Sequence, residues 1–180
     1  MQHHWGTLDA DTVSRWLNFR GEKDWHYDSG NRESMAAKQT EGVAYLWNLL
    51  SEKGLALLAD EVGMGKTFQA LGVAALMWKM NPDARVLVMA PNRDIGYHWR
   101  REFQALVRNH YRETDHNVKN SIDGGPIPSV QLCFGLESLA AAVERGAGHL
   151  YLTTIHSLSG LVPSQEKDRN NLQGQARTAA

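Results

Sequence analysis

The sequence predicts an α/β fold in which helices cover both faces of a parallel sheet. Short apolar runs typical of strands alternate along the chain with amphipathic stretches typical of helices. The apolar runs are nearly continuous, which is the pattern of strands buried on both faces. Of the 180 residues, 42% are hydrophobic and 22% are charged, so the chain has the composition of a globular protein with a core.

The first 33 residues are polar and are predicted to form an N-terminal arm (residues 1–33). A short helix is expected over Asp11–Phe19, because Val13, Trp16 and Leu17 fall on one helical face. The three tryptophans of the arm are expected to pack it onto the rest of the chain.

Residues 34–52 are predicted to form the first long helix. Ser34 is its expected N-cap, and Gly54 stands where a glycine commonly ends a helix. The apolar run Leu55–Asp60 is too short for a helix and is predicted to be a buried strand. A second long helix is expected over Lys66–Met80. It should end there because Asn81 precedes Pro82, and the residue before a proline avoids helical geometry.

The alternation continues to about residue 160. The further predicted elements are a strand at Arg85–Ala90, a helix at Asp94–Asn109, a strand at Val130–Phe134, a helix at Glu137–Arg145 and a strand at Leu150–Ile155. Residues 110–128 read as a surface loop, and residues 161–180 form a polar tail. One domain, residues 34–160, therefore follows the arm.

A phosphate-binding loop joins the first predicted strand to the helix at Lys66. The stretch ends in Gly-Lys-Thr, the core of the Walker A pattern. The pattern has a glycine at its first position, and Asp60 occupies that position here. Glycines bring backbone N–H groups close to phosphate, and the helix start favours an anion. The predicted nucleotide-binding residues of the loop are Glu61, Val62, Gly63, Met64, Gly65, Lys66 and Thr67.

Two side chains of the loop carry its predicted chemistry, with ATP and Mg²⁺ as the cofactors. Lys66 is the predicted catalytic residue, because its ammonium group neutralises the β- and γ-phosphates. The hydroxyl of Thr67 is the predicted protein ligand of Mg²⁺.

Four ordered stretches of the chain resemble motifs of superfamily II helicases, and most of all the Swi/Snf-type DNA translocases. Those proteins place Asp-Glu before the glycines of the loop, where Asp60 and Glu61 stand here. The other matches are a glutamine motif, a strand-loop motif that ends in Trp-x-x-Glu-Phe, and a strand that ends in Thr-Thr. The four stretches are LLADEVGMGKT (57–67), QTEGV (39–43), VLVMAPNRDIGYHWRREF (86–103) and LTTIHSL (152–158).

The resemblance covers about residues 34–160 and implies the first part of a RecA-like P-loop NTPase domain. It implies that Gln39 hydrogen-bonds the adenine edge, although Met35–Lys38 replace the Leu-Arg-x-Tyr run usual before that glutamine. It also implies that the backbone of double-stranded DNA is held by the loops after the second and fourth predicted strands. The residues so implied are Pro91, Asn92, Arg93, Thr153, Thr154 and His156.

The resemblance implies further parts of the same motor beyond residue 180. These are a strand ending in Asp-Glu, which holds Mg²⁺ and positions water, and a second RecA-like domain with an arginine finger. We therefore expect an ATP-dependent DNA helicase or translocase of which residues 1–180 alone hydrolyse ATP poorly. Two alternatives stay open: another P-loop ATPase of defence or signalling type, or a non-enzymatic nucleotide-binding module.

Charge, cysteine content and hydropathy limit the remaining possibilities. The net charge is −1 and the pI is about 6.7, so nucleic acid can be bound only by local patches. The Arg100–Arg101 pair is interpreted as a solvated helix face. The single cysteine, Cys133, forms no internal disulfide. No stretch reaches the roughly 20 apolar residues that span a membrane, so we expect a soluble protein of the bacterial cytoplasm or of the nucleus.

Overall fold

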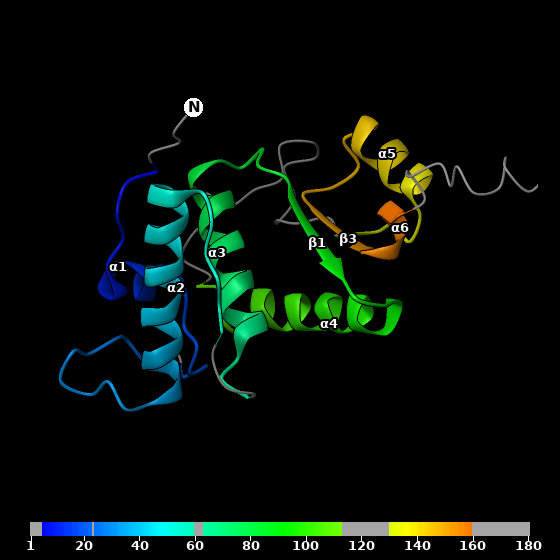
Figure 1. Ribbon diagram of the computed structural model, residues 1–180. Coiled ribbons are helices and arrows are strands. Elements are labelled where there is room, and N and C mark those ends of the chain that lie inside the picture. Colours follow the sequence, from blue (N-terminus) through cyan, green and yellow to red (C-terminus); the bar gives the residue numbers. More distant parts are fainter. Residues whose placement is uncertain (1–4, 23, 60–62, 113–129, 160–180) are drawn as a thin grey trace, which may run out of the picture.

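A computed structural model describes residues 5–22, 24–59, 63–112 and 130–159 of the chain. It confirms the predicted α/β fold with a parallel sheet and flanking helices (Figure 1). The elements in chain order are α1 (Ala10–Trp16), α2 (Met35–Lys53), α3 (Lys66–Met80), β1 (Val86–Ala90), α4 (Arg93–Asn109), β2 (Val130–Leu132), α5 (Leu136–Glu144), β3 (Leu150–Thr154) and α6 (His156–Ser159).

The two ends of α2 are set by the residues that the sequence indicates. The Ser34 hydroxyl accepts a hydrogen bond from the Ala37 N–H at 3.2 Å, which satisfies one of the unpaired donors of the first turn. At the other end, Gly54 takes a left-handed conformation with φ 71°, which glycine adopts without strain. Both predicted caps of this helix are confirmed.

The sheet has three parallel strands in the order β1-β3-β2. β3 is central, and all five of its residues are buried. Its register pairs Val86 with Leu150 on one side and Val130 with Leu150 on the other. The carboxyl ends of the three strands therefore lie along one edge of the sheet, next to the first turn of α4 (Figure 1).

The prediction of a buried strand at Leu55–Asp60 is wrong for the residues that the structure describes. Residues 55–59 form no strand, and Leu55 and Leu57 are 77% and 83% exposed. A strand needs a neighbour for its N–H and C=O groups, and none of the described strands pairs with this segment. Asp60 lies outside the described residues.

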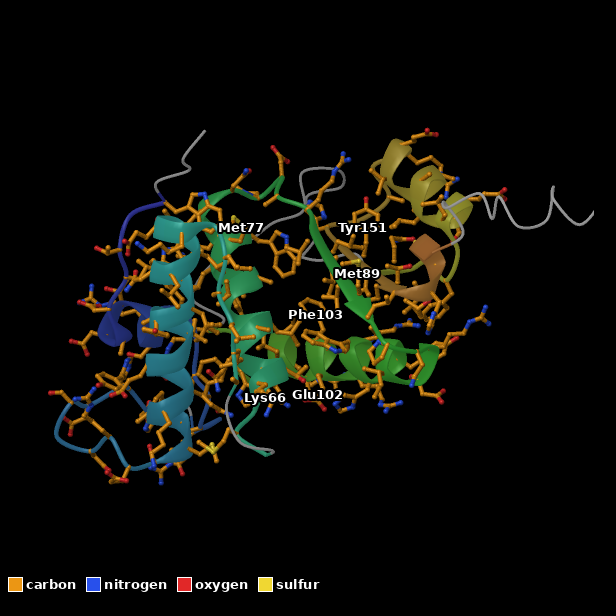
Figure 2. All side chains as sticks on the ribbon, viewed as in Figure 1. Lys66, Met77, Met89, Glu102, Phe103 and Tyr151 are labelled. Atoms are coloured by element: carbon orange, nitrogen blue, oxygen red, sulfur yellow. The ribbon has the colours of Figure 1, made fainter. Side chains whose placement is uncertain are left out.

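Burial on both faces of the sheet is confirmed for β3 and wrong for β1. β1 lies at one edge of the three-stranded sheet, and its residues Leu87 and Met89 are 46% and 50% exposed. The alternate residues Val86 and Val88 pack against the main core. Figure 2 shows Met89 and Tyr151 on neighbouring strands, and Phe103 on α4.

The main core lies between α1, α2, α3, α4 and one face of the sheet. It includes Trp47 and Trp78, which are 0% and 1% exposed, and also Val13 and Leu17 of the predicted arm, both 0% exposed. The arm's tryptophans pack against the same core. A second, smaller cluster joins Cys133 and Tyr151 to the inner face of α5.

Backbone contacts fasten the segment after α1 to the end of α4. The Asn18 N–H donates to the His110 carbonyl at 2.7 Å, and Leu17 forms an isolated antiparallel bridge with Tyr111. The Arg112 Nε donates to the Ser14 carbonyl at 2.7 Å. Burial lowers the pKa of the Arg112 guanidinium from its usual value.

Candidate nucleotide and nucleic-acid sites

The described part of the phosphate loop, Gly63–Thr67, runs directly into the start of α3. Gly63 and Gly65 have φ values of 90° and 72°, a conformation that residues with a side chain rarely adopt. Gly65 is the N-cap of α3, and no side chain forms a capping hydrogen bond there. The backbone N–H groups of a first helical turn, together with the helix dipole, form an anion-binding site.

Helix α2 places Gln39 against this loop. Gln39 is 9% exposed, and its Nε2 atom lies 2.0 Å from the position that a Cβ at residue 65 would occupy. Two motifs that are 26 residues apart in the sequence therefore meet in space. The contact also explains why residue 65 is glycine, because any side chain would displace the Gln39 amide.

The crossing of α2 and α3 is equally close one turn further along. A Cβ at Gly42 would lie 2.1 Å from the Gln69 Oε1 atom, and a Cβ at Gly72 would lie 2.9 Å from Val43 Cγ2. The Gln69 Nε2 atom donates to the Met64 carbonyl of the loop at 3.1 Å. The two helices thus fix the position of the loop through small residues and an amide hydrogen bond.

Lys66 and Thr67 are both partly exposed in the first turn of α3, with Lys66 labelled in Figure 2. Glu61 and Val62, which the sequence also assigns to the nucleotide, lie outside the described residues. Across the described ranges, no cluster of three or more His, Cys, Asp or Glu side chains could hold a metal ion. A single hydroxyl fits Mg²⁺ well, since this ion takes most of its ligands from phosphates and water.

A second candidate site lies where the three strands end. The Ile155 N–H, just after β3, donates to the Ala90 carbonyl at the end of β1 at 2.9 Å, so the two loops lie side by side. They form an open pocket of about 390 Å³, here called the sheet-edge pocket. Its lining residues are Pro91, Asn92, Arg93, Phe134, Thr154, His156 and Ser157.

The pocket brings together five of the six residues that the resemblance assigns to DNA. Asn92 is also the N-cap of α4, where its Oδ1 accepts from the Ile95 N–H at 2.9 Å. Thr154 is 7% exposed, and its Oγ1 lies 2.8 Å from the Ser157 Oγ. Ligands of open α/β sheets bind at this carboxyl edge, so the position suits a binding role.

Thr153 is the one residue of that set that the structure places elsewhere. It is 0% exposed, and its Oγ1 has no hydrogen-bond partner within the described part of the chain. Successive strand residues point to opposite faces of a sheet, so Thr153 and Thr154 cannot both face the pocket. The Thr153 hydroxyl is therefore out of reach of a phosphate in this conformation.

Sequence reasoning missed Phe134. Its ring lies 5.4 Å from the Arg93 guanidinium and 5.4 Å from the Tyr97 ring, edge to face. A Cβ at Gly96 would lie 3.1 Å from the Phe134 ring, so this glycine lets the ring approach α4. The available signal was its place at the end of the predicted strand Val130–Phe134, at the same edge as the loop of Arg93.

A glycine-rich loop that opens a helix within a parallel α/β fold defines the class of P-loop nucleotide-binding proteins. A family profile described as "Type III restriction enzyme, res subunit" matches residues 32–177. That match spans most of the chain, so the chain belongs to this family.

Several curated proteins are similar to part of the chain. The ATP-dependent helicase fft1 of Schizosaccharomyces pombe is 27% identical over 119 residues, which is 56% of this chain and 12% of that protein. The DNA repair and recombination proteins RAD54-like of Danio rerio and Gallus gallus are 31% and 28% identical over 85 and 102 residues. These two matches cover 42% and 48% of this chain, and 10% and 12% of the relatives.

The matches confirm the resemblance to superfamily II helicases of the Swi/Snf type. The chain spans only about a tenth of the length of these relatives.

Within the described ranges, none of the helices combines the length and the apolar character that a membrane-spanning segment needs. Cys133 is buried, and this burial raises the pKa of its thiol, as expected for a packing residue.

Proposed function

We propose that this chain is the ATP-binding part of a motor that couples ATP hydrolysis to movement along double-stranded DNA. The observation that carries the proposal is the uncapped start of α3 behind Gly65, with the Gln39 amide against it. Support also comes from the family match and from the helicase and DNA-repair relatives.

In this proposal the phosphate loop holds ATP together with Mg²⁺. The first-turn N–H groups of α3 donate hydrogen bonds to the phosphate oxygens, and Lys66 neutralises the β- and γ-phosphates. Thr67 gives its hydroxyl to Mg²⁺, which supplies charge neutralisation when it is bound. Gln39 hydrogen-bonds the adenine edge, and it already lies against the loop.

The DNA backbone is proposed to lie in the sheet-edge pocket. Asn92, Thr154 and the Arg93 guanidinium offer an amide, a hydroxyl and a cation, which suit phosphate oxygens and carry no sequence preference. Such contacts fit a motor that moves along DNA of any sequence. We also propose that the protein works where DNA is stored. In eukaryotes, the group of organisms from which the three relatives come, that compartment is the nucleus.

The alternative of a P-loop ATPase without a DNA track gains less support. It accounts for the phosphate loop but gives no role to the polar pocket at the strand ends, which draws residues from three separate loops. It also gives no reason for similarity to proteins named for helicase activity and DNA repair.

The proposal is tested by steady-state ATP hydrolysis of the full-length protein, with and without duplex DNA. We expect duplex DNA to stimulate turnover at least several-fold, and the Lys66→Ala variant to lose both basal and stimulated turnover. Lys53→Ala, at the far end of α2, is the matched control and should behave as the wild type. An ATP hydrolysis rate that duplex DNA does not change, or that persists in Lys66→Ala, would contradict the proposal.

A further inference from the structure

We infer that the exposed face of α4 binds the phosphate backbone of duplex DNA and extends the track that begins at the sheet-edge pocket. This inference rests on the proposed function and adds to it five residues of α4 besides Arg93, which is already a proposed DNA contact. The face is formed by Arg93, Tyr97, Arg100, Arg101, Gln104 and Arg108, and is here called the α4 basic face.

Helical geometry places these six residues together. Five of them, Arg93, Tyr97, Arg100, Gln104 and Arg108, follow one another at steps of three or four positions, and Arg101 lies four positions after Tyr97. All six therefore share one side of the helix. The opposite side carries Phe103 and Leu106, which are 3% and 0% exposed and pack into the main core. The arginines therefore point away from the core, and all six residues of the face are exposed.

The charge of the face is out of proportion to that of the chain. The chain as a whole carries a net charge of −1, yet this face carries four arginines. Within the described ranges, none of the four forms a salt bridge. The acidic residue Asp94 borders the face at its first turn, where a carboxylate interacts well with the helix dipole.

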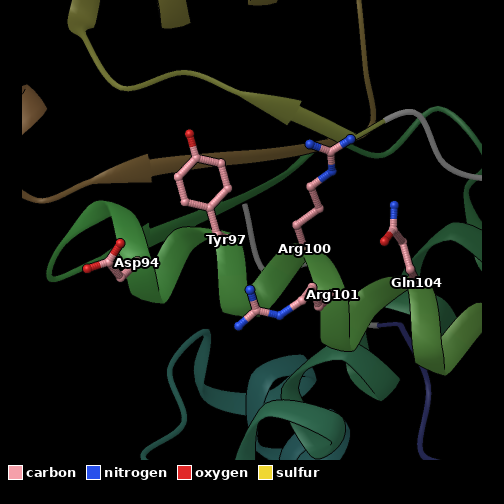
Figure 3. Close-up of a pocket in the computed structure, with 5 residues that line it drawn as sticks. All are labelled: Asp94, Tyr97, Arg100, Arg101 and Gln104. Carbon is pink, nitrogen blue, oxygen red and sulfur yellow. The ribbon is translucent and has the colours of Figure 1, made fainter.

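The middle of the face is hollowed. Asp94, Tyr97, Arg100, Arg101 and Gln104 line an open pocket of about 390 Å³, and Figure 3 shows these five side chains projecting from successive turns of α4. Two guanidinium groups and an amide can donate many hydrogen bonds to phosphate oxygens. An open, polar and positively charged hollow suits a DNA backbone better than a small apolar ligand.

The α4 basic face continues directly into the sheet-edge pocket. Arg93 belongs to both, and the Phe134 ring of the pocket contacts both Arg93 and Tyr97. From Arg93 to Arg108 the helix rises about 22 Å, which is the length of about six base pairs of duplex at roughly 3.4 Å each. One DNA backbone can therefore contact the strand-end loops and the helix face together.

The test is the salt dependence of duplex binding by the full-length protein, measured by anisotropy of a labelled duplex. Each neutralised phosphate contributes about 0.9 to the slope of log K against log salt. We expect Arg100→Gln/Arg101→Gln to make that slope shallower by about 1.8, and to lower the affinity roughly ten- to hundredfold near 0.1 M salt. Arg100→Lys/Arg101→Lys keeps the charge and should retain most of the wild-type slope.

The matched control removes two arginines elsewhere. Arg15→Gln/Arg20→Gln lie on and just after α1 and should leave the slope unchanged. Melting temperature and ATP affinity should not change in any of these variants. A wild-type slope in Arg100→Gln/Arg101→Gln, with a shallower slope in Arg93→Ala, would overturn the inference alone. Failure of the wild type to bind duplex DNA would overturn both the inference and the proposed function.

Discussion

The phosphate loop is held by its backbone and by close packing, whereas the sheet-edge pocket is lined by side chains at the ends of strands, and more than half of them are exposed. At the loop, the Gln39 amide already occupies the space that a Cβ of residue 65 would need. At the pocket, Pro91, Asn92 and Arg93 are all exposed. The first region should therefore be sensitive to added atoms, and the second to lost charge.

Of these two regions, the phosphate loop should show the larger effect, and Gly65→Ala tests it. The new methyl group meets the Gln39 amide, and the φ of 72° costs a residue with a side chain about 1–2 kcal/mol. ATP affinity should fall about tenfold or more, because the loop must move to relieve both strains. Isothermal titration with Mg²⁺-ATP measures the change.

Gly54→Ala is the control that separates the cost of a positive φ from the steric clash with the Gln39 amide. Gly54 has nearly the same φ, 71°, but a Cβ there would have no atom within 4 Å, and the residue lies at the far end of α2. Its substitution should lower the free energy of unfolding by about 1 kcal/mol and leave ATP affinity unchanged. If Gly65→Ala binds ATP as well as this control, close packing does not hold the loop.

A smaller and different effect is expected from Arg93→Ala. Loss of one cation from the sheet-edge pocket should make the slope of log K against log salt for duplex DNA shallower by about 0.9. ATP affinity should stay the same, since Arg93 belongs to α4 and not to the loop. An unchanged slope, together with unchanged DNA stimulation of ATP hydrolysis, would remove Arg93 from the track.

Local signals in the sequence predicted most of the helices and their ends. Ser34 and Gly54 mark the ends of α2, and α3 runs from Lys66 to Met80 as expected. The glycine-rich loop was also predictable, because its pattern is local. The predicted strand at Leu55–Asp60 failed for the opposite reason, since a strand depends on a neighbour that an apolar run does not specify.

The sheet-edge pocket depends on distant residues, and the sequence predicted it only in part. Phe134 reaches Arg93 through the pairing of β2 with β3, which no local pattern reveals. The different positions of Thr153 and Thr154 were foreseeable, because neighbouring strand residues face opposite ways. The apolar spacing of α4 did predict a solvated face with Arg100 and Arg101, and this is confirmed because both residues are exposed.

The central claim is that the start of α3 is an ATP site in which Lys66 contacts the phosphates. Titration of the wild type, Lys66→Ala and Lys53→Ala with Mg²⁺-ATP tests it most directly. We predict that the wild type and Lys53→Ala bind with the same affinity, and that Lys66→Ala loses most of its binding while its melting temperature is unchanged. Equal affinity in all three proteins would contradict the claim.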